Sequence, residues 1–81
     1  MALETSTIRD HLAIAERHVA EGERHIARQR NVVKQLGEDG HDQKMAFDLL
    51  ALFEDMQQLH ISDRDRLRTE LARLQQSDSE K

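Results

Sequence analysis

The residues of this sequence best suited to chemistry are its five histidines, three of which recur at intervals of seven. His11, His18 and His25 occupy equivalent positions of a seven-residue repeat. Residues 15–28 consist of one heptad, AERHVAE, followed by a near copy, GERHIAR. A recurrence of seven returns a side chain to nearly the same azimuth after two turns of an α-helix. The repeat therefore predicts a helix that presents one strip to a partner, with imidazoles gathered along that strip.

A metal site is the first chemistry that these histidines suggest. Glu21 and His25 are four residues apart, hence on one helix face, with His18 above them and with His60 or a second subunit to complete the coordination. Helical di-metal bundles, however, use Glu-x-x-His sets from several helices, whereas the phrase here is Glu-Arg-His, whose acid and imidazole point in nearly opposite directions. Histidines that flank a helical seam more often pair with neighbouring carboxylates. A metal-binding carboxylate and histidine bundle is therefore kept as an alternative, and no cofactor is predicted.

His60 differs from the other histidines because helical counting places it inside an apolar face, between Phe53 and Leu67. Asp63 lies one turn further on, and antiparallel packing would bring His18 close. We expect His18, His60 and Asp63 to form a buried polar layer that fixes the register of the core. A pH-sensitive switch is a second interpretation, in which charging both histidines loosens an assembly below about pH 6.

Other kinds of site have little support. The arginines form two groups, but acidic residues alternate with them, the net charge is −4 and no aromatic residue is near for base stacking, so nucleic acid is not an expected partner. There is no nucleophile beside a base and no glycine loop that could cradle a phosphate, so an enzyme is not expected.

The absence of cysteine excludes disulfides and thiolate metal sites. The first residues lack the apolar stretch of a signal peptide, and no apolar run approaches the roughly 18 residues that span a bilayer. We therefore expect a cytoplasmic protein with no membrane partner.

Two long helices must position the histidines. No proline, three glycines and 35% charged residues in 81 predict an all-α fold. A stripe with alternating steps of four and three predicts a helix over about residues 7–36, capped at Thr5, Ser6 or Thr7. The members of this stripe are Ile8, Leu12, Ala15, Val19, Gly22, Ile26, Gln29, Val33 and Leu36.

The motif GEDG then predicts a turn. Gly37 stands where a helix ends on a left-handed residue, Gly40 follows, and Asp42 is the expected N-cap of the next helix, with Asp39 as its rival. The second helix is predicted over about 43–76, with fraying from 77 to 81. Its first half carries two adjacent apolar stripes, which is wider than one partner helix covers, and its second half carries one.

A short turn requires antiparallel packing, so residues 1–81 are predicted to form a single αα-hairpin domain in which facing residue numbers add to about 79. This register places the missing side chain of Gly22 opposite bulky Met56. It leaves Leu50, Leu52 and Leu59 uncovered within one hairpin. Since so short a chain builds only a marginal core, we expect two hairpins to form a homodimeric four-helix bundle.

The stretches HVAEGERHIARQRNVVKQLGEDGHD, LLALFEDMQQLH and DRDRLRTEL resemble a group of small helical-hairpin proteins of alphaproteobacteria to which no function is assigned. The resemblance covers about residues 11–74 and includes Gly40, His41, Asp42 and His60. It implies a bacterial, cytoplasmic, helical protein and transfers no catalytic residue. The group tends to have a further histidine near Asp63, which this chain lacks.

The predicted function is a non-enzymatic helical module for self-association or protein interaction, with a regulatory role as one form of it. A heterotypic adaptor, whose partner supplies the missing half of the bundle, is the rival. The predicted contact residues are Ile8, Leu12, Leu50, Leu52, Leu59, Leu67 and Leu71.

Overall fold

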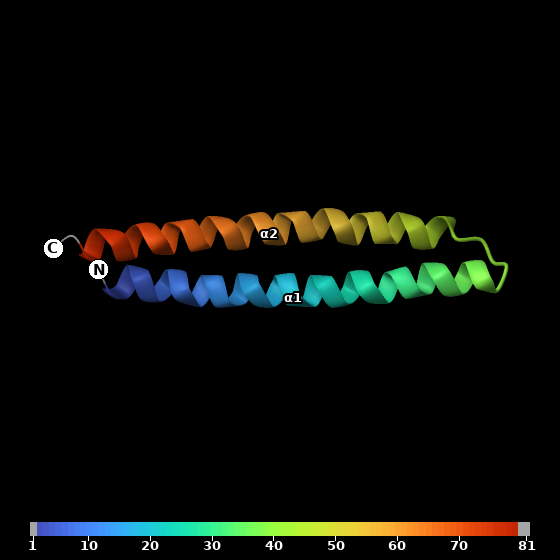
Figure 1. Cartoon of the computed structure of the whole chain (residues 1–81), viewed down its shortest axis with the longest axis horizontal. Helices are drawn as coiled ribbons and strands as arrows, with labels where there is room; N and C mark the ends of the chain where they lie inside the picture. The colour runs from blue at the N-terminus through green and yellow to red at the C-terminus, as the bar shows by residue number, and fades with distance from the viewer. Residues whose placement is uncertain (1, 80–81) are drawn as a thin grey trace.

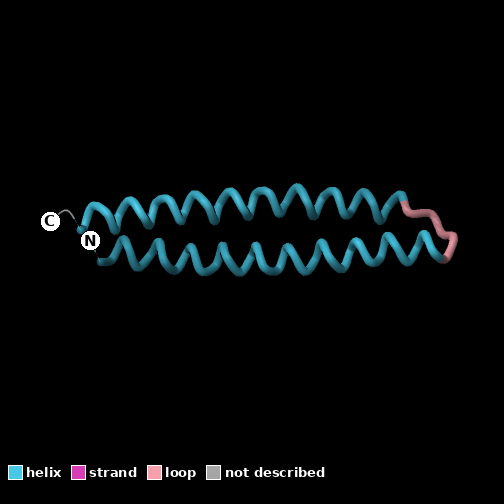
Figure 2. The backbone as a smooth tube through the Cα atoms, viewed as in Figure 1, coloured by secondary structure: helices cyan, strands magenta, loops and turns pink. Residues whose placement is uncertain are grey.

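The computed structural model describes residues 2–79, which form two long helices joined by a short turn (Figure 1). Helix α1 spans Ala2–Glu38 and helix α2 spans Lys44–Ser79. The helices lie side by side and antiparallel, with the turn at one end and both chain ends at the other (Figure 2). The molecule is a rod with extents of 65 × 14 × 13 Å. The predicted all-α antiparallel hairpin is thereby confirmed.

Both helices are longer than the sequence pattern predicted. Helix α1 begins at Ala2, so the expected cap among residues 5–7 is wrong, and Thr5 lies within the helix with only 8% of its surface exposed. Thr5 continues the stripe in step with Ile8, and α2 runs alongside to Ser79, so packing extends α1 past its hydroxyl residues. Helix α2 extends to Ser79, past its predicted end at about residue 76, and the predicted fraying of this end stays a prediction. Residues 80 and 81 lie outside the described part of the chain.

The end of α1 is a Schellman motif, and it corrects the role given to Gly37. The N–H of His41 donates to the carbonyl of Leu36 at 2.9 Å, and the N–H of Gly40 donates to that of Gly37 at 3.2 Å. This pair of bonds requires a left-handed residue at Gly40, whose φ is 74°. Gly37 is still helical. It lies against the Gln43 side chain, which a Cβ at Gly37 would meet at 2.5 Å.

The start of α2 is capped as predicted. The Asp42 Oδ1 accepts a hydrogen bond from the N–H of Lys44 at 3.0 Å, which satisfies one of the unpaired donors of the first turn. Asp39, the rival cap, instead accepts a bond from the Gln35 side chain at 3.5 Å.

The seam between the helices is thin. Its buried apolar residues are Ala15, Val19, Val33, Ala46 and Leu67. Most of these are small, and none of the large side chains in the described part is fully buried. A pair of helices offers each other only one narrow strip, so the hairpin has a seam where a larger domain has a core.

Three glutamines fasten this seam. Gln29 and Gln57 are buried, and each donates from its Nε2 to a carbonyl of the opposite helix at 2.9 Å, Gln29 to Ala46 and Gln57 to Val19. Gln43 donates in the same way to the Val33 carbonyl at 2.8 Å. The residue numbers of donor and acceptor add to 75 or 76 in all three, so one geometry recurs along the rod. Slippage of either helix would break all three bonds, and we therefore assign the fixing of the register to them.

Within one hairpin, the predicted polar layer of histidines is not buried. His18 and Asp63 are exposed and His60 is only half-buried. The Asp63 carboxylate pairs with Arg66 at 2.6 Å on the surface of α2. The buried polar groups are amides, which can donate to a carbonyl without bringing a charge into the seam.

The neighbour of Gly22 is also corrected, because Gln57 and not Met56 lies opposite it. A Cβ built on Gly22 would lie 1.9 Å from the Gln57 Oε1 and 2.7 Å from its Cδ. That oxygen is buried and has no hydrogen-bond partner within the described residues. Gly22 is therefore required by the glutamine that crosses it.

Candidate interaction surface

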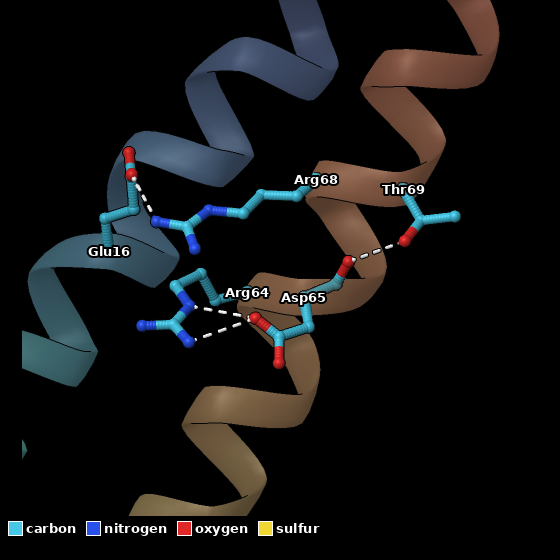
Figure 3. A network of polar contacts seen from close by, with 5 residues as sticks. All are labelled: Glu16, Arg64, Asp65, Arg68 and Thr69. Carbon is cyan, nitrogen blue, oxygen red and sulfur yellow. Dashed lines mark hydrogen bonds and ion pairs between the residues drawn. The ribbon is translucent and has the colours of Figure 1, made fainter.

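The rod has two long faces of different chemistry. Glu16 and Arg68 each directly follow a buried residue of the seam, and their side chains meet across the helices at 3.2 Å, as Figure 3 shows. Arg30 and Glu54 make a second crossing pair at 3.6 Å, and by helical spacing they lie on the same side. We call this side the ion-pair face. Charges that pair across an exposed seam indicate a face in contact with water.

The opposite side carries a row of hollows, and we call it the groove face. Residues that directly precede the seam positions, such as His18 before Val19 and Met56 before Gln57, point to this side. A central groove of about 260 Å³ lies at mid-length. It is lined by His18, Glu21, Gly22, His25, Phe53, Met56, Gln57 and His60. Shallower hollows continue on the same side towards the turn and towards the chain ends.

All four metal-ligand candidates named from the sequence, His18, Glu21, His25 and His60, line the central groove. The rings of His18 and His60 come together across the helices, with centroids 5.2 Å apart and planes tilted by 51°. The His25 ring lies instead on Phe53, at 5.9 Å. Between residues 2 and 79, no group of three or more histidine, aspartate, glutamate or cysteine side chains is placed to hold a metal ion. The histidines therefore share a groove without converging on one point.

The most conspicuous feature of the groove face is a line of exposed apolar side chains on α2, which we call the α2 stripe. Its members follow at steps of four, three, four and three: Met45, Leu49, Leu52, Met56 and Leu59. Their exposed fractions are 85%, 41%, 53%, 45% and 72%. The α1 side of this face offers far less: among the residues whose burial the structure describes, its exposed large apolar side chains are Ile14 and Val32. An unbroken apolar row of this length on one helix is typical of a contact with another helix.

Beyond Leu59 the same spacing of four and three residues continues with charged side chains, which we call the charged continuation: Asp63, Arg66, Glu70 and Arg73. They pair along their own helix, Arg66 with Asp63 and Arg73 with Glu70. The hydrogen bond from Arg73 lowers the pKa of the Glu70 carboxyl below its ordinary value, and the same bond raises the pKa of Arg73. The stripe thus changes from apolar to charged at about the middle of the rod.

The predicted contact residues divide into three groups by their exposure. Leu52 and Leu59 are exposed members of the α2 stripe, whereas Leu67 is buried between the helices with 4% exposed. The other four, Ile8, Leu12, Leu50 and Leu71, are half-buried. The terminal seam of Ile8, Leu12, Leu67 and Leu71 therefore belongs to the packing of α1 on α2.

Met45, Leu49 and Met56 were not predicted as members of the exposed surface. Counting in steps of four and three in both directions from Leu52 would have found them.

Comparison of the chain with family models, curated proteins and solved structures gives no match. In the part of the chain that the structure describes, neither helix is apolar enough over a sufficient length to cross a bilayer.

Proposed function

We propose that this chain is a non-enzymatic homotypic interaction module, in which the α2 stripe of one hairpin packs against a second copy. The observation that carries this proposal is the row of five exposed apolar residues on the side of the rod opposite the crossing ion pairs. A second copy of this chain is a better match than an unrelated partner. The α2 stripe is apolar and covers about half the length of α2, so it can pack against the same stripe of another hairpin.

The exposed area supports this proposal. The hairpin exposes 6178 Å², whereas a compact protein of 9.4 kDa exposes about 5,000 Å². The radius of gyration, 18.4 Å, likewise exceeds the roughly 12 Å of a compact chain of this length. A specific interface of standard size buries about 800 Å² on each partner. The excess area of one hairpin is therefore large enough to supply such an interface.

The thin seam points the same way. Five buried apolar residues, most of them alanine or valine, supply little of the burial that offsets the conformational entropy of ordering two long helices. A symmetric dimer buries the α2 stripe of both copies, so each residue of the stripe contributes twice to the free energy of association.

Two matched substitutions test the proposal. Leu52 and Phe47 are almost equally exposed, 53% and 51%, but Leu52 lies on the α2 stripe and Phe47 directly follows a seam residue, on the side of the ion-pair face. We expect Leu52→Glu to weaken dimerisation by about 30- to 100-fold, since each copy loses about 1 kcal/mol of apolar burial and two carboxylates approach each other. Phe47→Glu should change it less than threefold.

Sedimentation equilibrium over a range of concentrations measures both effects. Equal weakening by the two substitutions would contradict a contact through the α2 stripe. A wild-type chain that stays monomeric throughout would instead favour the heterotypic adaptor.

A further inference from the structure

We propose that the second copy docks antiparallel on the α2 stripe, with the two-fold axis passing beside Leu52 and the two turns pointing in opposite directions. This inference rests on the proposed function and adds to it which helix meets which, in what register and over what length.

The groove face is asymmetric. The exposed apolar side chains lie mainly on α2, whereas the α1 side of the central groove presents His18, Glu21 and His25. If the two turns lay at the same end, symmetry would place each α2 over the α1 of the other copy. At the register of the hairpin, Leu52 would then face the region of Arg28. Apolar burial is greatest if α2 meets α2 instead.

The spacing of the α2 stripe suits antiparallel pairing of α2 with α2. Met45 and Leu59 each lie seven residues from Leu52, while Leu49 lies three before it and Met56 four after it. Antiparallel pairing about Leu52 therefore sets Leu52 against Leu52 and Met45 against Leu59. Leu49 of one copy and Met56 of the other come within one residue, about 1.5 Å along the helix, of facing each other. The apolar residues of the stripe can therefore pack among those of the other copy.

The α2 stripe ends at Leu59, well short of the end of the rod. Its length from Met45 to Leu59 is about 21 Å, against 65 Å for the whole rod. With the axis at Leu52, the turn of the second copy lies just beyond Leu59, where the charged continuation begins. The ion pairs of Asp63 with Arg66 and of Glu70 with Arg73 then stay in water, where their solvation is kept. A dimer with aligned turns would bring these charges into the contact.

The docked pair is consequently a partial bundle. Four helices lie together only over the turn-proximal segments, and the terminal half of each hairpin extends beyond the other copy. Those terminal halves carry the seam of Ile8, Leu12, Leu67 and Leu71, of which Leu67 is buried within the hairpin and the other three are half-buried.

Cysteine cross-linking tests this arrangement directly, because the chain has no cysteine of its own. In a symmetric contact a residue beside the axis meets its own copy, so Leu52→Cys should form a covalent dimer under mild oxidation. Ala51→Cys, one residue away and directed to another side of α2, is the matched control and should react at least tenfold more slowly.

A second pair of variants retains Leu52. Met45→Cys and Leu59→Cys should cross-link when mixed and should do so much less when each is oxidised alone. Aligned turns would instead favour cross-links between Leu52→Cys and Arg28→Cys in a mixture, and that result would overturn the proposed register. Sedimentation of the reduced proteins separates the two failures: no dimer refutes self-association, whereas a dimer with the wrong cross-links refutes only its geometry.

Discussion

The glycine at position 22 allows a quantitative test of the glutamine that crosses it. Alanine normally stabilises a helix interior by about 1 kcal/mol over glycine. At Gly22, however, the new Cβ would lie 1.9 Å from the Gln57 Oε1. The glutamine must therefore move, and the bond from its Nε2 to the Val19 carbonyl is lost.

The two effects oppose each other, and their magnitudes decide the outcome. Losing the hydrogen bond of a buried amide and leaving its partners unpaired costs about 1–3 kcal/mol. Gly22→Ala should therefore leave the free energy of unfolding unchanged or lower it by up to about 2 kcal/mol. In a chain that already carries Gln57→Ala, the three atoms nearest to the new Cβ are gone, and the same substitution should stabilise by about 1 kcal/mol.

Chemical denaturation of the four chains of this cycle, at one protein concentration because association contributes to stability, gives the coupling energy. We expect a coupling of about 1–3 kcal/mol. A coupling within the roughly 0.5 kcal/mol of simple additivity would refute the role assigned to Gln57. The same cycle at Gly37 and Gln43 should give a smaller value, because that glutamine is only partly buried.

Two further predictions concern the turn and the charged pair of Glu70 and Arg73. Gly40→Ala should destabilise the hairpin by about 1 kcal/mol in thermal unfolding, because Gly40 has a φ of 74° that side chains disfavour. The pKa of Glu70 is lowered in the folded chain, so its pairing with Arg73 stabilises the fold at pH values above the ordinary carboxyl pKa of 4.5. This stabilisation is lost as the pH falls through the lowered pKa. Glu70→Gln should therefore alter stability at neutral pH, modestly and less so in high salt, and should have no effect once that carboxyl is protonated.

The hairpin could be predicted because its signals are local and periodic. The steps of four and three fix which side of each helix meets the other, and the short turn at Gly40 leaves only antiparallel packing. The facing residues agree with the predicted register, since the His18–His60 and Gly22–Gln57 neighbours have numbers adding to 78 and 79. The early start of α1 was missed because Thr5 is both a good cap and an acceptable seam residue, and only the length of α2 decides between the two.

The polar layer could not be placed from the sequence for a different reason. His60 and Gln57 both interrupt the apolar face of α2, and spacing alone does not say which is buried. Gln57 is buried because Gly22 leaves room for an amide to reach the Val19 carbonyl, a contact between residues 38 positions apart. The exposure of the α2 stripe was likewise only partly foreseen, because the exposed width of a helix depends on how little its neighbour covers.

The most direct test of self-association is the molar mass of the unmodified chain by light scattering, through a dilution series at neutral pH. Packing through the α2 stripe predicts twice the 9.4 kDa of one chain, declining towards the single mass only on strong dilution. A fully helical, cooperatively folded protein that keeps the mass of one chain at every concentration would contradict it.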